Sequence, residues 1–192
     1  MMAQAFLIRH PQVEGSGLCY GRTELDVTEQ ALQAALARCL PDLAAVPPLP
    51  LLSSPALRAR RLALAVQAAR GAAPYSLAPG FQEIDFGEWD GKTWEQIGKQ
   101  ALDEWAANPV HFAAPGGESL CDMAQRVLLA WRDLRRQFPQ GAIVVCHGGP
   151  MRLLAAQCAD PTLQQAAQLA QAALDSAWRP EFGALLTLPY PP

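Results

Sequence analysis

The sequence predicts an α/β fold, a three-layer sandwich in which helices flank a mostly parallel central sheet. Three short apolar runs, at residues 6–8, 49–53 and 143–145, lack the polar–apolar alternation that half-exposed strands show. Segments with helical periodicity separate these runs, and interleaved strands and helices favour a parallel sheet covered on both faces. With 192 residues, of which 51% are hydrophobic, the chain can build one domain with its own core.

The first strand is predicted at residues 6–8, an apolar run that Arg9 closes. A helix follows from Thr28, because threonine is one of the residues that cap helix N-termini. We expect this helix to extend to about Leu40, since Pro41 cannot donate the backbone hydrogen bond that a further turn requires. These elements form the first strand–helix unit.

The second strand–helix unit is predicted to start with the strand at residues 49–53. Ser54 supplies a helix N-cap, and Pro55 takes the first helical position, where a missing N–H costs nothing. The helix extends to Arg70 and ends at Gly71, since glycine readily adopts the left-handed conformation that closes helices.

The middle of the chain predicts two more helices. Thr93 and Gln96 have the spacing of a capping box, which starts the first of them. The second is strongly amphipathic, because apolar residues recur at every third or fourth position. These residues are Leu120, Met123, Val127, Trp131, Leu134 and Phe138. We expect residues 1–192 to form a single domain, with a cap or lid insertion at about residues 90–118.

The last third of the chain predicts a strand, two helices and a final strand. Residues 143–145 form a fully apolar strand, after which Gly148 and Gly149 lead into a helix. An alanine-rich helix is expected at about residues 162–174, and the last strand at residues 185–188.

The composition argues against several classes of protein. The net charge is −3 at pH 7, whereas nucleic acids and anionic membranes favour basic partners. No apolar run is long enough for a membrane span or a signal-peptide core. The five cysteines include no C-x-x-C pair, which indicates reduced thiols rather than disulfides or a zinc site. We expect a soluble, cytoplasmic protein with a small-molecule substrate; the sequence leaves its oligomeric state open.

Cationic and glycine residues follow the predicted strands. Arg9 and His10 follow the first strand, Arg58 lies in the first helical turn after the second, and His147 and Gly148 follow the third. Ligands of open α/β sheets bind beyond the carboxyl ends of the strands, so we expect these residues to converge. Arginine binds phosphate with two hydrogen bonds, and helix N-termini attract anions. The sequence therefore predicts a pocket for a phosphate monoester.

Five segments, in the same order along the chain, resemble motifs of the histidine phosphatase superfamily, also called phosphoglycerate-mutase-like. They are LIRH at residues 7–10, SSPALRA at 53–59, EIDFGEWDG at 83–91, GGESL at 116–120 and VVCHGG at 144–149. Within the superfamily, residues 19–23 and 83–91 look most like the α-ribazole phosphatases of cobalamin assembly. The resemblance implies a phosphoglycerate-mutase-like α/β fold and a phosphatase activity.

The resemblance also implies a mechanism without metal or cofactor, because side chains supply the positive charge around the phosphate. His10 would be the nucleophile that forms a phosphohistidine. Glu83 would protonate the leaving oxygen and then activate water; the carboxylates Asp85, Glu88 and Asp90 lie nearby, and only the resemblance singles out Glu83. The phosphate oxygens would be bound by Arg9, Arg58, His147 and Gly148.

Three positions depart from the family pattern or are candidates only. Pro11 lies where the family usually has glycine, and it offers no N–H to a phosphate. Ser16 aligns near a position that is often asparagine, and its hydroxyl is a candidate substitute for that hydrogen bond. Arg22 is a further candidate substrate contact, although a solvated loop charge is an equal expectation.

Three other functions remain open. Phosphoglycerate mutase-type phosphotransfer uses the same nucleophile, and a non-catalytic phosphate-binding module uses the same pocket. Cys146 and Arg152 also have the Cys-x5-Arg spacing of cysteine-based tyrosine phosphatases, in which a thiolate attacks phosphorus. Against this third alternative, Pro150 removes one N–H from the loop, and the interpretation leaves His10 without a role.

Overall fold

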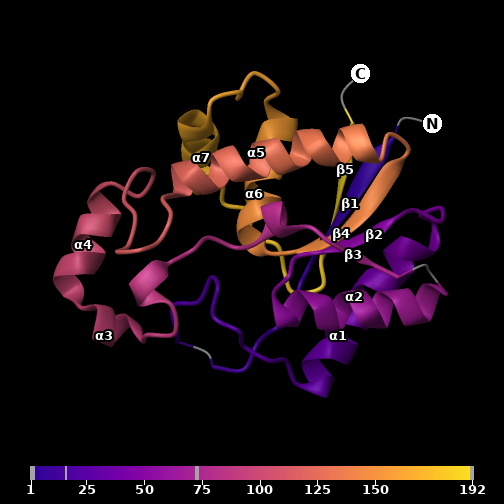
Figure 1. Ribbon diagram of the computed structural model, residues 1–192, viewed down its shortest axis with the longest axis horizontal. Helices are drawn as coiled ribbons and strands as arrows, with labels where there is room; N and C mark the ends of the chain where they lie inside the picture. The colour runs from indigo at the N-terminus through magenta and orange to yellow at the C-terminus, as the bar shows by residue number, and fades with distance from the viewer. Residues whose placement is uncertain (1–2, 16, 72–73, 191–192) are drawn as a thin grey trace.

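The computed structural model describes residues 3–15, 17–71 and 74–190 (Figure 1). One sheet contains its five strands in the order β3-β2-β4-β1-β5. They are β1 (Gln4–Arg9), β2 (Leu51–Ser53), β3 (Ser76–Leu77), β4 (Gly141–Cys146) and β5 (Leu185–Pro189). Neighbouring strands are parallel, except that β5 runs antiparallel to β1. The predicted α/β class with a mostly parallel sheet is confirmed.

Helices cover both faces of the sheet. The helices α1 (Glu29–Ala44) and α2 (Leu57–Arg70) pack on one face, where Ile8 and Val145 belong to the same buried cluster. The opposite face, with Leu7 and Val144, is covered by α5 (Leu120–Gln137), α6 (Gly148–Ala159) and α7 (Ala166–Asp175). Successive residues of β1 and β4 therefore alternate between two apolar layers, which explains why both strands are continuous apolar runs.

The segment between β3 and α5 extends away from the sheet (Figure 1). It contains two short 3₁₀ turns, Pro79–Phe81 and Gly87–Trp89, and the helices α3 (Trp94–Ile97) and α4 (Lys99–Ala107). Its aromatic side chains form a small core of their own, in which Trp105 packs edge-to-face against both Phe86 and Trp89. The predicted capping box of Thr93 and Gln96 is present at the start of α3.

Three predicted helix boundaries were wrong, including the start of the alanine-rich helix α7, which begins at Ala166 instead of about residue 162. The helix α1 continues through Pro41 to Ala44, because the fully buried Leu43 in its last turn contributes packing that outweighs one lost backbone hydrogen bond. The helix α2 is capped by Ala56 instead of Ser54, and the Ser54 hydroxyl is used elsewhere, as described below. The left-handed Gly71 closes α2 as predicted.

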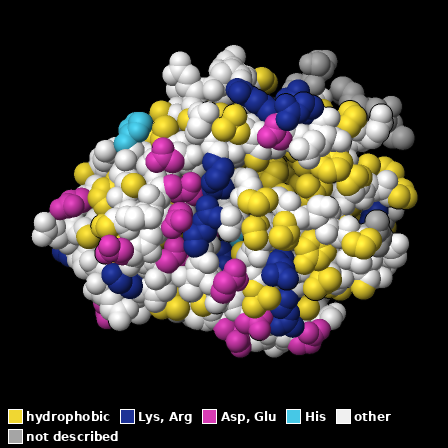
Figure 2. Space-filling model, viewed as in Figure 1, with side chains coloured by type: hydrophobic (Ala, Val, Ile, Leu, Met, Phe, Trp, Pro, Cys, Tyr) yellow, Lys and Arg dark blue, Asp and Glu magenta, His cyan; other side chains and the backbone are white. Residues whose placement is uncertain are grey.

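The register of the sheet sets the position of the candidate site. Arg9 pairs with Cys146, and Ser53 pairs with Val145, so β1, β2 and β4 end at the same edge. Hydrophobic side chains gather on part of the surface that Figure 2 shows. Leu77 and Leu129 are large hydrophobic residues that are about half exposed, at 54% and 49%. Among the described residues, no helix is both long and apolar enough to cross a membrane.

Candidate active site

The site lies where β1, β2 and β4 end. Arg9 is the last residue of β1, and His10 is the next residue after the strand. Ser54 follows β2, and His147 is the N-cap residue of α6 directly after β4. Parallel strands thus bring together residues that are far apart in the sequence, as the strand-end positions predicted.

His10 is buried, with 2% of its surface exposed. Its backbone N–H donates to the Cys146 carbonyl at 2.9 Å, and its Nδ1 lies 2.6 Å from the Pro11 carbonyl oxygen. A carbonyl oxygen only accepts, so Nδ1 carries the proton and Nε2 keeps its lone pair. Burial and the charge of Arg58 lower the pKa of His10 well below its usual value, a hydrogen bond to Pro11 opposes this, and Arg9 lowers the pKa further.

His147 lies beside His10, with the two ring centroids 5.0 Å apart. Its Nε2 is 2.7 Å from the Ser54 hydroxyl oxygen, whereas its buried Nδ1 has no hydrogen-bond partner in the described part of the chain. Burial, followed by the charges of His10 and Arg58, lowers the pKa of His147 well below its usual value. Both histidines are therefore neutral around pH 7.

Arg58 is completely buried on the first turn of α2. It donates to the backbone carbonyls of Gly21 at 2.6 Å and Thr23 at 3.0 Å, and its guanidinium carbon is 5.3 Å from the centre of the Tyr20 ring. Burial lowers the pKa of Arg58, and the nearby carboxylate of Glu83 partly offsets this effect. The Nε of Arg58 has no partner among the described residues.

Residues in the C-terminal part of the chain hold the Arg9 side chain in place. Its Nη1 donates to the Pro180 carbonyl at 2.5 Å, and its guanidinium carbon is 4.0 Å from the centre of the Phe182 ring. Its buried Nε has no partner in the described structure. A Cβ on Gly148 would lie only 3.5 Å from this Nε, so the N-terminus of α6 and the Arg9 guanidinium are immediate neighbours.

Glu83 reaches the site from the segment before α3. Its Oε1 accepts from the Ile84 backbone N–H at 3.0 Å, and its Oε2 accepts from the Gly149 N–H at 3.1 Å. A Cβ at Gly149 would lie 2.1 Å from Oε1, so only glycine lets the carboxylate approach α6 this closely. The Gly148–Gly149 pair therefore lies against both the Arg9 guanidinium and the Glu83 carboxylate.

The neighbouring carboxylates have other contacts. Asp90 accepts hydrogen bonds from the backbone N–H groups of Gly21, Arg22 and Thr23 and from that of Phe86. Asp85 accepts from the Gly87 N–H. Glu88 is exposed. Of the four carboxylates in this segment, Glu83 alone lines the pocket described next.

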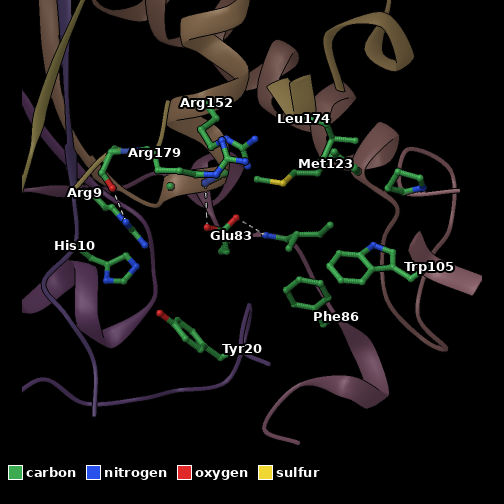
Figure 3. Close-up of a pocket in the computed structure, with 16 residues that line it drawn as sticks. Arg9, His10, Tyr20, Glu83, Phe86, Trp105, Met123, Arg152, Leu174 and Arg179 are labelled. Carbon is green, nitrogen blue, oxygen red and sulfur yellow. Dashed lines mark hydrogen bonds between the residues drawn. The ribbon is translucent and has the colours of Figure 1, made fainter. Parts of the chain in front are cut away.

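A pocket of about 330 Å³ opens at this edge of the sheet (Figure 3). Arg9, His10 and Tyr20 lie at one end, and Phe86 and Trp105 lie at the other. The other large apolar residues of the lining are Ile84, Pro109, Leu120, Met123 and Leu174. Glu83 lies between the two ends, which places a polar group at the junction of a cationic half and an apolar half.

Three of the predicted site residues that the structure describes, Arg58, His147 and Arg22, are not part of this pocket lining. Arg58 and His147 are completely buried. The side chain of Arg22 lies between two carboxylates, with Nε 3.8 Å from Oδ2 of Asp85 and Nη2 3.6 Å from Oε1 of Glu118. Ser16 lies outside the described residues.

Sequence reasoning missed two arginines of the pocket, Arg152 and Arg179. Arg152 follows His147 by five residues on α6, and the sequence drew attention to it only through the Cys-x5-Arg spacing. Arg179 lies in the loop before β5, and no motif marks it. Cys146 is completely buried, and burial raises the pKa of its thiol, which is the opposite of what a nucleophilic thiolate requires.

Known proteins are similar to this chain in sequence and in fold. A candidate phosphoserine phosphatase 2 of Hydrogenobacter thermophilus is 29% identical over 158 residues, which cover 80% of this chain and 77% of that protein. A mycobacterial glucosyl-3-phosphoglycerate phosphatase has the same fold, with a TM-score of 0.80, 22% identity and coverage of 97% of this chain and 90% of that chain. The α-ribazole phosphatase of Shigella flexneri has a TM-score of 0.78 at 22% identity, covering 96% of this chain and 89% of that chain.

The family follows from the sequence itself. The family model of the histidine phosphatase superfamily (branch 1) matches residues 5–177, which include every strand end that contributes to the site. This chain therefore belongs to the histidine phosphatase superfamily, branch 1, a family of phosphomonoester hydrolases.

Proposed function

We propose that this phosphatase is metal-independent and acts through a phosphohistidine at His10. One observation carries the proposal: the two arginines whose charges act on His10, and the histidine beside it, each have a buried nitrogen without a partner in the described structure, namely Arg9 Nε, Arg58 Nε and His147 Nδ1. Buried donors without partners are costly, and a phosphate group supplies oxygens that accept from all of them. The N–H of Gly148, at the positive end of the α6 dipole, adds a fourth donor.

In the first step, Nε2 of His10 attacks phosphorus and the bond to the leaving oxygen breaks. Nδ1 of His10 keeps its proton and donates it in a hydrogen bond to the Pro11 carbonyl, so Nε2 attacks as a neutral nucleophile. Arg9 and Arg58 stabilise the charge that spreads over the equatorial oxygens. The carboxyl proton of Glu83 moves to the leaving oxygen, and the alcohol departs.

In the second step, water attacks the phosphohistidine. The Glu83 carboxylate, free of its proton after the first step, takes one proton from the water as the new P–O bond forms. The N–P bond breaks, its electron pair returns to Nε2 of His10, and inorganic phosphate is released. Glu83 lies beside the N-terminus of α6 through its bond to Gly149, which keeps it within reach of the phosphoryl group throughout.

The finer assignment that the sequence supports is α-ribazole 5′-phosphate, with a role in cobalamin assembly. It rests on residues 19–23 and 83–91, and on the apolar end of the pocket, where Phe86 and Trp105 offer flat faces to an aromatic base. Residues 90–118 provide Trp105 and Pro109 to the pocket, and we propose that they cap the bound substrate. The similar proteins named above carry three different substrates in their names, so the substrate must be measured.

The test is phosphate release in EDTA from α-ribazole 5′-phosphate and a panel of phosphoesters, with His10→Ala and Cys146→Ser compared with the wild type. We expect turnover in EDTA, loss of turnover in His10→Ala and near-normal turnover in Cys146→Ser. A rapidly quenched reaction should contain acid-labile, alkali-stable phosphoenzyme. Conversion of 3- to 2-phosphoglycerate with bisphosphoglycerate present would favour a mutase instead, and binding without phosphate release would favour a binding module.

A further inference from the structure

Two arginines enter the pocket beside Glu83 without an assigned task. Arg152 comes from α6 and Arg179 from the loop before β5, and Figure 3 shows both side chains directed into the region above Glu83. Arg152 is tied by Nη2 to the Ala173 carbonyl. Arg179 is tied by Nη1 to the carbonyls of Ser176 at 2.5 Å and Trp178 at 3.0 Å. Backbone carbonyls thus position both guanidiniums without neutralising either.

The charges of the pocket do not balance without a further anion. Neither Arg152 nor Arg179 forms an ion pair with a carboxylate of the described residues, and the buried Nε of Arg152 has no partner there. A bound phosphate carries roughly −1.5 to −2 at neutral pH, which Arg9 and Arg58 already offset. Glu83 is the one carboxylate among the described residues of the pocket lining, and a single carboxylate offsets at most one of the two remaining positive charges.

The two guanidiniums also repel each other. Burial, and then the charge of Arg179, lower the pKa of Arg152, while the charge of Glu83 raises it. Because Arg152 is partly desolvated, the like charge of the exposed Arg179 beside it is unfavourable unless a bound anion relieves the repulsion. An anionic oxygen group between the two guanidiniums would do so, and would also give the Arg152 Nε an acceptor.

The position of the pair indicates which part of the substrate carries this anion. The proposed phosphate site lies at the Arg9 and His10 end, and Glu83 marks the leaving oxygen. Arg152 and Arg179 lie near Glu83, between that end and the apolar wall of Phe86 and Trp105 (Figure 3). A group held there belongs to the alcohol that leaves, and not to the phosphate under attack.

We infer that the substrate is a phosphomonoester whose alcohol part carries a second anionic group, a carboxylate or a further phosphate, which Arg152 and Arg179 bind. This inference rests on the proposed function and narrows its substrate class. The alcohol part of α-ribazole 5′-phosphate carries no anionic group, so that assignment and this inference predict opposite results for the two arginines.

The test compares kcat/KM, in EDTA, for phenyl phosphate, 3-carboxyphenyl phosphate, its uncharged 3-carbamoyl analogue and 1,3-phenylene bisphosphate. The phenyl ring suits the apolar wall, and the carbamoyl ester matches the carboxylate in shape without its charge. We expect the wild type to prefer an anionic ester over the carbamoyl ester by about 10- to 100-fold, the range of a charge-assisted hydrogen bond. Whether the carboxylate or the second phosphate gives the larger preference identifies the anion.

In Arg152→Gln and Arg179→Gln, this preference should fall towards one. Arg179 is exposed, so its variant stays informative even if Arg152→Gln folds poorly. Arg136→Gln is the matched control, because Arg136 is an exposed α5 residue paired with Asp133; it removes the same charge and should leave the preference unchanged.

Two results would overturn the inference while leaving the phosphatase intact. One is equal kcat/KM for the anionic and carbamoyl esters in a wild type that hydrolyses both. The other is α-ribazole 5′-phosphate turning over faster than every anionic ester, with a rate that neither arginine variant alters. Failure to hydrolyse any ester would instead contradict the proposed function.

Discussion

The hydroxyl of Ser54 lies 2.7 Å from Nε2 of His147, although 93 residues separate them in the sequence. The pairing of β2 with β4 brings them together, and the Ser54 backbone N–H also donates to the Val145 carbonyl at 2.8 Å. Because His147 is neutral, a hydroxyl that donates to Nε2 leaves the proton on Nδ1. In the proposed function this Nδ1–H is the donor to the phosphate, and Ser54 is then a positioning residue.

Ser54→Ala should therefore impair both catalysis and stability. Without the hydroxyl, the proton of His147 is free to move to Nε2, and the donor to the phosphate is lost. We expect kcat/KM to fall about 10- to 100-fold and the free energy of unfolding to fall by about 1–3 kcal/mol, the cost of a buried unpaired group. Enzyme kinetics, urea denaturation and the ¹⁵N shifts of the His147 ring would measure these effects.

Ser53→Ala is the matched control, because its buried hydroxyl donates to the Ser54 carbonyl and does not contact His147. It should destabilise the protein while leaving the tautomer of His147 and most of kcat/KM intact. Equal kinetic losses in the two variants would show that Ser54 has only a structural role.

The two buried histidines predict a specific loss of stability in mild acid. Their pKa values lie well below the usual value in the folded state, so the unfolded chain takes up protons first as the pH falls through about 6.5. Unfolding is then favoured, and the free energy of unfolding should fall by up to about 1.4 kcal/mol per pH unit for each histidine. Above pH 6.5 this contribution should be constant.

Urea denaturation at pH 5, 6, 7 and 8 would measure this dependence, and the slope between pH 5 and 6.5 should roughly halve in His10→Asn. The acid limb of kcat/KM reports the free enzyme, and it should lie below pH 6.5, since His10 must be neutral to attack. The pKa of Asp90 is also lowered in the folded state, but this carboxylate changes the free energy of unfolding only in stronger acid. A free energy of unfolding that stays constant from pH 5 to 7 would contradict the assigned protonation states.

Sequence reasoning could place His10, Arg58 and His147 at one edge because strand ends follow from local patterns. Apolar runs locate the strands, and parallel strands end at the same edge. Packing, however, decides what local patterns leave open. Pro41 is an unfavourable helix residue by itself, and only the burial of Leu43 explains why α1 continues through it.

Residues that contribute through long-range contacts were beyond such reasoning. Nothing near Arg179 in the sequence marks it as a pocket residue, because the path of the loop before β5 depends on the whole fold. Ser54 appeared to be a helix cap because serine favours that position, and only the neighbouring strand shows that its hydroxyl serves His147. The chain brings such pairs together only after the sheet has formed.

Asp90 should affect catalysis through the loop that holds Arg58. Its carboxylate accepts from three consecutive N–H groups, those of Gly21, Arg22 and Thr23, and Arg58 donates to the carbonyls of Gly21 and Thr23. Asp90→Asn removes the charge and replaces one acceptor oxygen by a donor. We expect KM for phosphate esters to rise and kcat/KM to fall about 10-fold, the value of roughly one charge-assisted hydrogen bond.

Glu88→Gln is the control for this variant, because Glu88 is exposed two residues away and should keep the kinetics of the wild type. Binding of vanadate or inorganic phosphate should weaken in Asp90→Asn along with KM, since the proposed function has Arg58 bind the phosphate itself. An unchanged phosphate affinity would show that the loop does not control Arg58.

Glu83→Gln should affect the formation and the hydrolysis of the phosphohistidine differently. Its effect on formation should depend on how acidic the leaving alcohol is. Glutamine keeps the size of the side chain but holds no transferable proton, so alcohols that need protonation should leave about 100- to 10,000-fold more slowly. A 4-nitrophenyl ester, whose leaving group needs little protonation, should form phosphohistidine at a rate much nearer to that of the wild type. Hydrolysis of the phosphohistidine should still be slow, so phosphoenzyme should accumulate.

Asp85→Asn tests the neighbouring carboxylate, which accepts a hydrogen bond from Gly87 and faces Arg22. A dependence on leaving group in Asp85→Asn, and none in Glu83→Gln, would transfer the acid–base role to Asp85.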